Sequence, residues 1–399
     1  MAAVRKCELW DRRGGGHEAA FAVSVRPLYA LSAICLAAVV LRLVVMYYFG
    51  NGQDGNPVDI YYVDQQAAKQ ILDLRDPYLY SGYTNHYGGS VIFVYLPLVP
   101  IYFTPFVLAG IDIRYGAIAA DVITILTIYL IAGSIQRTNQ GYPWVPLLAS
   151  AVYAVMPISI WLTAAVGSNL MVGAMFLSCA LAAITVERWS LAGLVLGLGL
   201  ATDQLLIILF PVFVTYFLSR RDPKTPLISV AVSLVVILPF VVPGPAQFLH
   251  DAVLFQFTRP LQQNGTWSLY SLVLSGTGFE MPVSVRVAIF IACTGVVACI
   301  LRRTEKELLT GLIVLGTVGA FVLPVDGFWS YFLLPIMVAC ALIPPMLLDF
   351  SQHADRGPSG TGGHPAGVAN SGVHPQGISV QCTQTRSRAS SDTPPVVLW

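Results

Sequence analysis

The chain has 399 residues, of which 56% are hydrophobic and only 11% are charged, and its mean hydropathy is +0.69. Soluble domains carry about 25% charged residues, so this composition excludes a soluble enzyme, a disordered chain and a coiled coil. The formal net charge of +1 gives no sign of a nucleic-acid partner. What remains is a polytopic membrane protein.

Ten apolar runs are candidates for spanning helices, each of which needs about 20 residues. They cover residues 27–49, 91–110, 117–134, 143–162, 168–186, 190–218, 227–243, 283–301, 308–324 and 329–348. The run 190–218 is too long for one untilted span and too short for two, so we expect a tilted or broken helix there. Its weak points are Gly197, Gly199 and Pro211. The sequence predicts an all-α transmembrane bundle of about ten spans, within a range of nine to eleven.

Basic residues near the ends of the spans indicate the orientation. Three groups are separated by even numbers of predicted crossings, which places them on one side: Arg5, Lys6, Arg12, Arg13 and Arg26; then Arg220, Arg221 and Lys224; then Arg302, Arg303 and Lys306. We therefore expect a multi-pass protein of the cell membrane with a cytoplasmic N-terminal arm (1–26), a membrane domain (27–349) and a cytoplasmic tail (350–399). The tail is rich in Gly, Ser, Pro and Thr, so it is expected to be disordered.

Cysteine and histidine give no metal signature. Seven cysteines show no paired spacing, and six histidines are scattered singly. The sequence therefore predicts neither a disulfide framework nor a metal cluster built from histidines.

The first predicted outer loop, residues 50–90, contains an amphipathic helix from about 59 to 74. Its apolar stripe repeats at spacings of three and four: Ile60, Val63, Ala67, Ile71 and Leu74. Asp76-Pro77 is expected to end the helix, because a residue before proline avoids the α conformation. Asp59 stands where a helix N-cap is expected, and the local pattern alone favours a cap over a catalytic role.

Tyrosines gather in the same region. Eight of the 18 fall between residues 61 and 102. They fit an aromatic belt at the lipid headgroups, and they fit equally well a carbohydrate site in which rings pack on sugar faces beside carboxylates. The sequence leaves both interpretations open.

Charged residues within spans are costly and are treated as functional hypotheses. Arg42, Asp121 and Asp203 are of this kind, while Arg286 lies near enough to an interface to extend its side chain to water. We favour a structural ion pair between Asp203 and Arg42 over a proton or substrate path, because no second acid in mid-span forms a relay with Asp203.

Short motifs in a fixed order resemble the GT-C superfold of polytopic glycosyltransferases, in particular the polyprenyl-phosphate-mannose-dependent mannosyltransferases. Each motif is weak, and together they reach to about residue 345. They are D-I-Y-Y-V-D at 59–64, D-P-Y at 76–78, Y-L-P at 95–97, Asp112-x-Arg114, G-x-x-x-G-L-x-L-A-T-x-Q at 193–204, L-P-F at 238–240 and a W-x-Y-F-x-x-L-P-like ending at 329–335.

This resemblance implies an inverting transfer of a hexose, mannose in the closest group, from a polyprenyl-phosphate donor to a glycan or lipid-linked acceptor on the outer face. The family's catalytic base corresponds to Asp59, with Asp64 supporting it or binding a divalent cation. Arg259 in the second outer loop (244–282) is the candidate for the donor phosphate, although it fits a headgroup contact equally well. The other candidates for substrate binding are Tyr62, Tyr78, Tyr83, His86 and Gln204.

Two departures from the family pattern put this function in question. Asp203-Gln204 stands where relatives often have Lys before Gln, and Ser168-Asn169 replaces an Asn-Asp pair. A membrane transporter or lipid flippase that uses Asp203 and Arg42 at the midplane is the main alternative, although paired repeats typical of transporters are not found. A third interpretation is a non-catalytic membrane subunit. The long acidic outer loop favours the enzyme.

Overall fold

A computed structural model describes residues 25–50, 59–84, 89–137, 144–258, 268–300, 304–325 and 329–355. All of them belong to one compact unit, Met1–Asp355. Their regular structure is helical apart from an isolated bridge between Thr84 and Ser90. The predicted all-α membrane class is therefore confirmed. The N-terminal arm and the tail lie outside the described residues, with two exceptions. α2 begins at Val25, inside the predicted arm 1–26, and α17 continues past the predicted boundary at 349 to Asp355.

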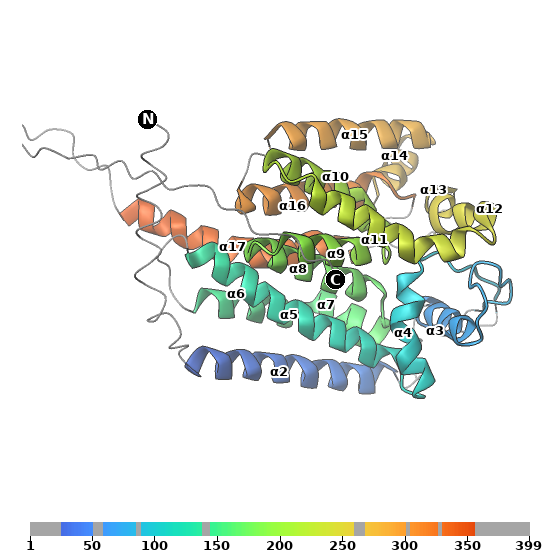
Figure 1. The fold of residues 1–399 in the computed structure, drawn as a ribbon, viewed down its shortest axis with the longest axis horizontal. Helices are drawn as coiled ribbons and strands as arrows, with labels where there is room; N and C mark the ends of the chain where they lie inside the picture. Colours follow the sequence, from blue (N-terminus) through green and yellow to red (C-terminus); the bar gives the residue numbers. More distant parts are fainter. Residues whose placement is uncertain are drawn as a thin grey trace, which may run out of the picture. The chain divides into compact units, whose positions relative to one another are not determined.

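Four described helices are long and apolar enough to cross a membrane by themselves: α2 (Val25–Gly50), α5 (Ile113–Arg137), α11 (Lys224–Val241) and α15 (Val283–Ile300). A fifth span exists if α6 (Val145–Ala154) is joined to the segment Pro157–Val166, which follows it at a bend of 51°. This segment consists of α7 (Pro157–Ile160) and η2 (Trp161–Val166). Further apolar helices run beside them (Figure 1): α8 (Leu170–Thr185), α9 (Trp189–Leu200), α10 (Gln204–Ser219), α16 (Glu305–Val322) and α17 (Leu333–Asp355). The count of ten spans stays a prediction.

The run 190–218 is two antiparallel helices. α9 ends at Leu200 and α10 begins at Gln204, with Asp203 in an extended conformation between them. The guanidinium of Arg220, just after α10, lies 5.7 Å from the ring of Trp189 at the start of α9, which brings these two ends together. The expected break is confirmed, but it falls at the capping residue Asp203, and Pro211 lies inside α10.

The predicted span 91–110 is wrong. Its helix, α4 (Leu98–Leu108), has 11 residues, about 16 Å of helix against a hydrocarbon core of about 30 Å. Figure 1 shows α4 lying across one end of the long helices. The amide of Leu98 donates to the Ala201 carbonyl at 3.0 Å, so α4 begins at the turn between α9 and α10.

Close packing of α9 on α11 depends on two glycines four residues apart. A Cβ atom at Gly197 would lie 2.5 Å from the Ser229 carbonyl oxygen, and one at Gly193 would lie 2.8 Å from that of Thr225. Only glycine lets the two backbones approach this closely, as in small-xxx-small contacts of membrane helices.

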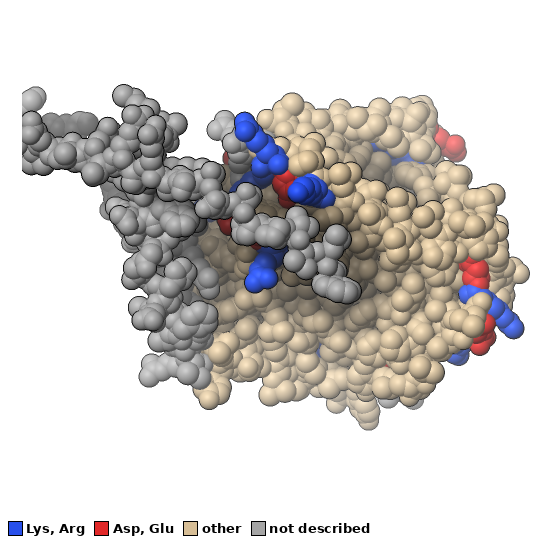
Figure 2. Space-filling view, viewed as in Figure 1, with Lys and Arg blue, Asp and Glu red and all other residues tan. Residues whose placement is uncertain are grey.

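The outer surface fits a lipid environment. Figure 2 shows Lys, Arg, Asp and Glu side chains gathered toward the two ends of the bundle, with a largely uncharged surface between them. Large apolar side chains are exposed on α2, α11 and α15, among them Leu36, Val235 and Ile291. The chain is therefore a multi-pass membrane protein.

Candidate functional site

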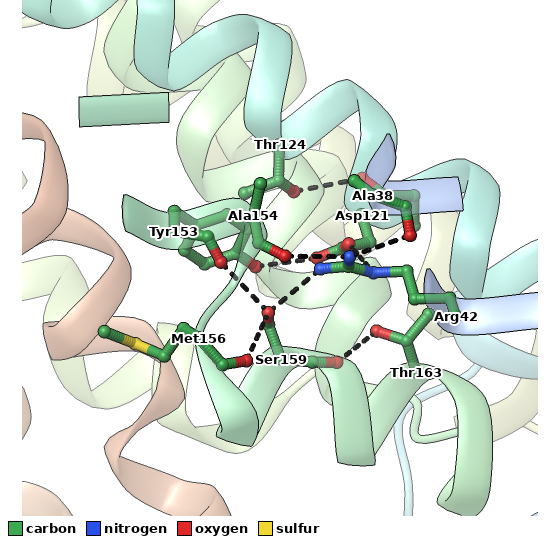
Figure 3. Close-up of polar contacts among 10 residues, drawn as sticks. Ala38, Arg42, Asp121, Thr124, Tyr153, Ala154, Met156, Ser159 and Thr163 are labelled. Carbon is green, nitrogen blue, oxygen red and sulfur yellow. Dashed lines mark hydrogen bonds and ion pairs between the residues drawn. The ribbon is translucent and has the colours of Figure 1, made fainter. Parts of the chain in front are cut away.

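Buried charge in the middle of the bundle forms a closed network (Figure 3). Arg42 on α2 places its Nε 2.5 Å from Asp121 Oδ2 on α5, and both side chains are fully buried. Arg42 also donates to the carbonyls of Ala38 and Ala154 and to Ser159 Oγ, at 3.0–3.1 Å. The second oxygen of Asp121 accepts a 3.0 Å hydrogen bond from the Tyr153 hydroxyl.

The predicted pair of Arg42 with Asp203 is therefore wrong. Asp203 is instead the N-cap of α10, where its Oδ1 accepts from the Leu205 amide at 2.7 Å. The turn between α9 and α10 carries Asp203 to the end of a helix, so it does not occupy the middle of a span. The structure does not bring together the two residues on which a transporter mechanism was based.

A different buried acid lies at the loop end of the bundle, on the amphipathic helix α3 (Asp59–Leu72). Val63 and Ala67 bury the apolar stripe as predicted, whereas Leu74 lies beyond the helix and is almost fully exposed. Asp64 is fully buried, and neither carboxylate oxygen has a hydrogen-bond partner among the described residues. Burial raises the pKa of Asp64 well above its ordinary value. Strongly perturbed acids of this kind mark candidate functional sites.

A cluster of aromatic rings packs against Val63 and Ala67, on the helix that carries Asp64. The ring of Tyr78 lies 4.7 Å from that of Phe248 and 5.3 Å from that of Phe93, between centroids. The hydroxyl of Tyr78 donates to the Tyr95 carbonyl at 2.5 Å, and that of Tyr83 donates to the Pro77 carbonyl at 2.8 Å. Tyr78 and Tyr83 are thus buried structural rings with occupied hydroxyls, and burial raises the pKa of each.

The second predicted outer loop contributes Phe248 and Ala252 to this cluster of rings. It begins with α12 (Pro245–Phe248), η3 (Leu249–Leu254) and α13 (Phe255–Thr258). Gln204, the first residue of α10, donates to the carbonyls of Val94 and Ala252 at 2.7 and 2.9 Å. One side chain therefore joins the segment that follows the first loop to the second loop.

A buried acid in η3 holds a histidine at this end. Asp251 Oδ1 lies 2.6 Å from His250 Nδ1, and its Oδ2 accepts from Gln247 at 2.7 Å. Sequence reasoning missed this group. The adjacent Asp and His were visible, but nothing in the sequence showed that the acid is buried while the ring is exposed.

A polar clamp fixes the start of α3 to α5. Arg114 and Asp112 form a short ion pair at 2.6 Å, and the Arg114 guanidinium lies 5.4 Å from the ring of Tyr61. Burial and the neighbouring Asp112 raise the pKa of Tyr61 to about 12. The Asp112-x-Arg114 motif thus positions the helix that carries Asp64.

Of the predicted site residues, Tyr78 and Tyr83 belong to one buried cluster with Val63 and Ala67 of α3, the helix that carries Asp64. Gln204 donates to the carbonyl of Ala252, which belongs to the same cluster. Tyr62 is half-buried on α3 with its ring 5.3 Å from that of Tyr61. The backbone of Asp59 begins α3, but its side chain lies outside the described residues, as do His86 and Arg259. Within the described part of the chain, no three His, Cys, Asp or Glu residues are grouped to hold a metal ion.

Comparison with known proteins identifies the fold. The structure is similar to an Archaeoglobus fulgidus oligosaccharyltransferase tethered to an acceptor peptide (TM-score 0.52, 13% identity, covering 84% of this chain and 51% of that one). It is also similar to ArnT from Cupriavidus metallidurans bound to undecaprenyl phosphate (TM-score 0.51, 16% identity, covering 82% and 61%). The protein therefore has the GT-C-like fold of membrane glycosyltransferases.

A curated relative from Mycobacterium tuberculosis is a polyprenol-phosphate-mannose-dependent α-(1-2)-phosphatidylinositol mannoside mannosyltransferase. It is 29% identical over 214 residues, 49% of this chain, and the match spans about half (47%) of the relative's length. Residues 36–261 match the family of the GPI transamidase subunit PIG-U, and the chain belongs to this family. The predicted relationship to GT-C enzymes is confirmed.

Proposed function

We propose that the protein transfers a hexose, with mannose as the first candidate, from a polyprenyl-phosphate sugar to an acceptor on the outer face of the cell membrane, with inversion. Asp59 is the general base in this proposal, and Asp64 supports it or binds a divalent cation. The observation that carries the proposal is the buried Asp64, for which the described part of the chain supplies no hydrogen-bond partner. It lies on the helix that Asp59 begins.

The donor class is supported by the relatives. The mycobacterial relative is named as polyprenol-phosphate-mannose-dependent, and the ArnT structure contains undecaprenyl phosphate. A donor with a long apolar chain also suits a site at the end of a membrane bundle, because the chain can stay in lipid while the sugar reaches the loops.

The chemistry requires a carboxylate near the acceptor. The attacking hydroxyl must lose its proton as the bond to the anomeric carbon forms, and a positioned base contributes about 10²–10⁴-fold to such a step. Inversion needs one base and no covalent intermediate. Burial makes an ionised Asp64 a stronger proton acceptor than an exposed acid, because its pKa is raised.

The test is transfer of labelled mannose from polyprenyl-phosphate-mannose by membranes that contain the protein. Asp59→Asn and Asp64→Asn are each expected to lower the rate at least about 100-fold. Asp73→Asn is the matched control, since Asp73 is exposed just beyond the same helix and its replacement is expected to leave the rate unchanged. Wild-type rates in the Asp59 variant would overturn the assignment of the base.

Family membership favours a second candidate, a non-catalytic subunit of a membrane enzyme complex. The matched family is that of a transamidase subunit, and the chain carries Asp203-Gln204 and Ser168-Asn169 in place of the GT-C residues. Asp203 and Gln204 are occupied with backbone groups, as a scaffold requires. Absence of transfer by the wild-type protein with every polyprenyl-phosphate hexose tested would favour this candidate over the enzyme.

A further inference from the structure

The start of the second outer loop is a continuous helical segment, Pro245–Thr258, which consists of α12, η3 and α13. It follows α11, which ends at Val241, and it lies at the same end of the bundle as α3 and α4 (Figure 1). Phe248 and Ala252 belong to the cluster of rings that packs on α3. One side of this segment is therefore part of the candidate site.

Another side of the segment is apolar and exposed. Leu249, Val253 and Leu254 are 49, 37 and 46% exposed. They share one side of η3, because a π-helix bonds residues five apart and so aligns residues four and five apart. α11 is apolar enough to cross the membrane and exposes Leu238 near its end, and Val242 just after it is also exposed. The exposed side of η3 continues this lipid-facing surface at the level of the head groups.

His250 lies beside these exposed residues, next to Leu249 and four residues before Leu254. Its side chain is 60% exposed, whereas that of Asp251 is 4% exposed. Its Nδ1 donates to Asp251 Oδ1 at 2.6 Å, and the other carboxylate oxygen accepts from Gln247 at 2.7 Å. A carboxylate only accepts hydrogen bonds, so this contact fixes the proton on Nδ1 and makes Nε2 of the neutral ring an acceptor.

The burial of Asp251 is costly for a residue whose partner is exposed. A charge placed among apolar groups costs free energy unless hydrogen bonds offset it. The carboxylate also acts on the cluster of rings, since burial and nearby charges, that of Asp251 among them, raise the pKa of Tyr78. A fixed tautomer gives a solvated histidine no benefit, but it gives a ligand a ring nitrogen with a fixed role. Asp251 is therefore a positioning residue that acts through His250.

We propose that His250 Nε2 accepts a hydrogen bond from a hydroxyl of the acceptor, and that this acceptor is itself anchored in the outer leaflet by a lipid. The inference rests on the proposed glycosyl transfer and narrows its acceptor to a lipid with a hydroxyl-rich head group. A ring that lies at head-group level, beside leucine and valine side chains in lipid, reaches such a head group directly. A water-soluble glycan would make no use of the apolar side of η3.

The experiment labels the full chain in nanodiscs of phosphatidylcholine with a mannosyl diacylglycerol that carries a diazirine on its sugar. After illumination, mass spectrometry is expected to find the probe on residues 245–258. His250→Ala is expected to lower this labelling about 10-fold, the effect of one lost hydrogen bond. His250→Gln is expected to restore part of it, because its amide oxygen can take the place of Nε2.

The apolar side of η3 is tested in the same measurement. The double variant Leu249→Asn with Val253→Asn is expected to lower the labelling, because it withdraws this side from lipid. Leu74→Asn is the matched control, since Leu74 is also an exposed leucine but follows α3. The methyl glycoside of the same diazirine-bearing mannose, which has no lipid, is expected to give only background labelling.

Transfer kinetics separate acceptor binding from a structural role. In the mannose assay with mannosyl diacylglycerol as acceptor, His250→Ala is expected to raise the KM for the acceptor about 10-fold. The KM for the donor and kcat are expected to stay unchanged, whereas a disrupted fold would change all three. Asp251→Leu is expected to raise the acceptor KM more than Asp251→Asn, whose amide oxygen still accepts from Nδ1.

Three results would overturn the inference: no labelling of residues 245–258 in the wild type, equal labelling of wild type and His250→Ala, or equal labelling by the methyl glycoside. The last would show a sugar contact that is indifferent to the lipid. Labelling as expected without any mannose transfer would count against the proposed transfer alone, because the labelling does not depend on the reaction.

Discussion

Asp121 and Asp64 are both fully buried acids, yet their surroundings are opposite. Asp121 has Arg42 on one oxygen and the Tyr153 hydroxyl on the other, whereas Asp64 has no hydrogen-bond partner within the residues that the structure describes. A paired charge in the bundle holds α2 to α5 and α6, which is a structural task. A buried acid without a partner costs stability, so its retention on α3 points to chemistry. Partners, and not burial, distinguish the two roles.

The largest expected effect comes from breaking the paired charge. Asp121→Ala leaves Arg42 buried and uncompensated, which is expected to cost about 3–5 kcal/mol of unfolding free energy. Denaturant unfolding in mixed micelles measures it, with the exposed Asp73→Ala as control. The double variant Arg42→Met with Asp121→Leu is expected to regain much of the loss. Wild-type stability in Asp121→Ala would show that the pair does not hold the bundle.

The pH dependence of stability tests whether Asp64 is buried without a partner charge. Its pKa is raised in the folded protein, so the folded state binds the proton more tightly than the unfolded state. The contribution of Asp64 to the free energy of unfolding is therefore fully present below its ordinary pKa near 4. It declines by up to about 1.4 kcal/mol per pH unit as pH rises toward the pKa of the folded protein. Asp64→Asn is expected to remove this part of the decline. Identical pH profiles for the two proteins would contradict a buried, unpaired Asp64.

Replacement of Gln204 tests whether packing at the loop end of the bundle depends on this one side chain. Gln204→Leu removes the donor from two carbonyls and is expected to cost about 1–3 kcal/mol. Hydrogen exchange should rise over residues 245–258 and stay unchanged in α5. Gln66→Leu is the matched control, because Gln66 donates to the Thr84 carbonyl at an exposed position. Equal effects of the two substitutions would argue against a special role for Gln204.

Ser159 gives the smallest expected effect. Ser159→Ala removes one of the three hydrogen-bond partners of Arg42 and leaves the ion pair intact, so a loss of about 1 kcal/mol is expected. The exposed Ser275→Ala serves as control in the same thermal unfolding measurement. A loss as large as that of Asp121→Ala would mean that the hydroxyl, and not the acid, stabilises Arg42.

Local sequence was sufficient to predict those features of the fold that residues close along the chain determine. The amphipathic period predicted α3 within two residues at its C-terminal end, and the length of the run 190–218 predicted a break. The partner of Arg42 was not predictable, because helical pattern says nothing about which spans are adjacent. Asp203 was misplaced for a related reason, since its cap geometry puts it at a helix end.

In the candidate site, too, the sequence identified residues but not their contacts. Gln204 was singled out, but its partners Val94 and Ala252 lie 110 and 48 residues away, so its task is set by tertiary packing. Val63 and Ala67, on the same helix as Asp64, likewise pack against rings from two other segments. Arg286 was assigned to the interface from its position near a helix end, and only the packing of four elements shows that it is enclosed.

The Arg42 network also bears on how the protein is made. Arg42 leaves the ribosome 79 residues before Asp121. At about 5–20 residues per second, the first span waits roughly 4–16 s for its counter-ion. An arginine deep in a span costs about 2.5–3.5 kcal/mol for insertion. During that interval the apolar residues of α2 alone must offset this cost, or α2 must remain beside the translocation machinery until α5 arrives.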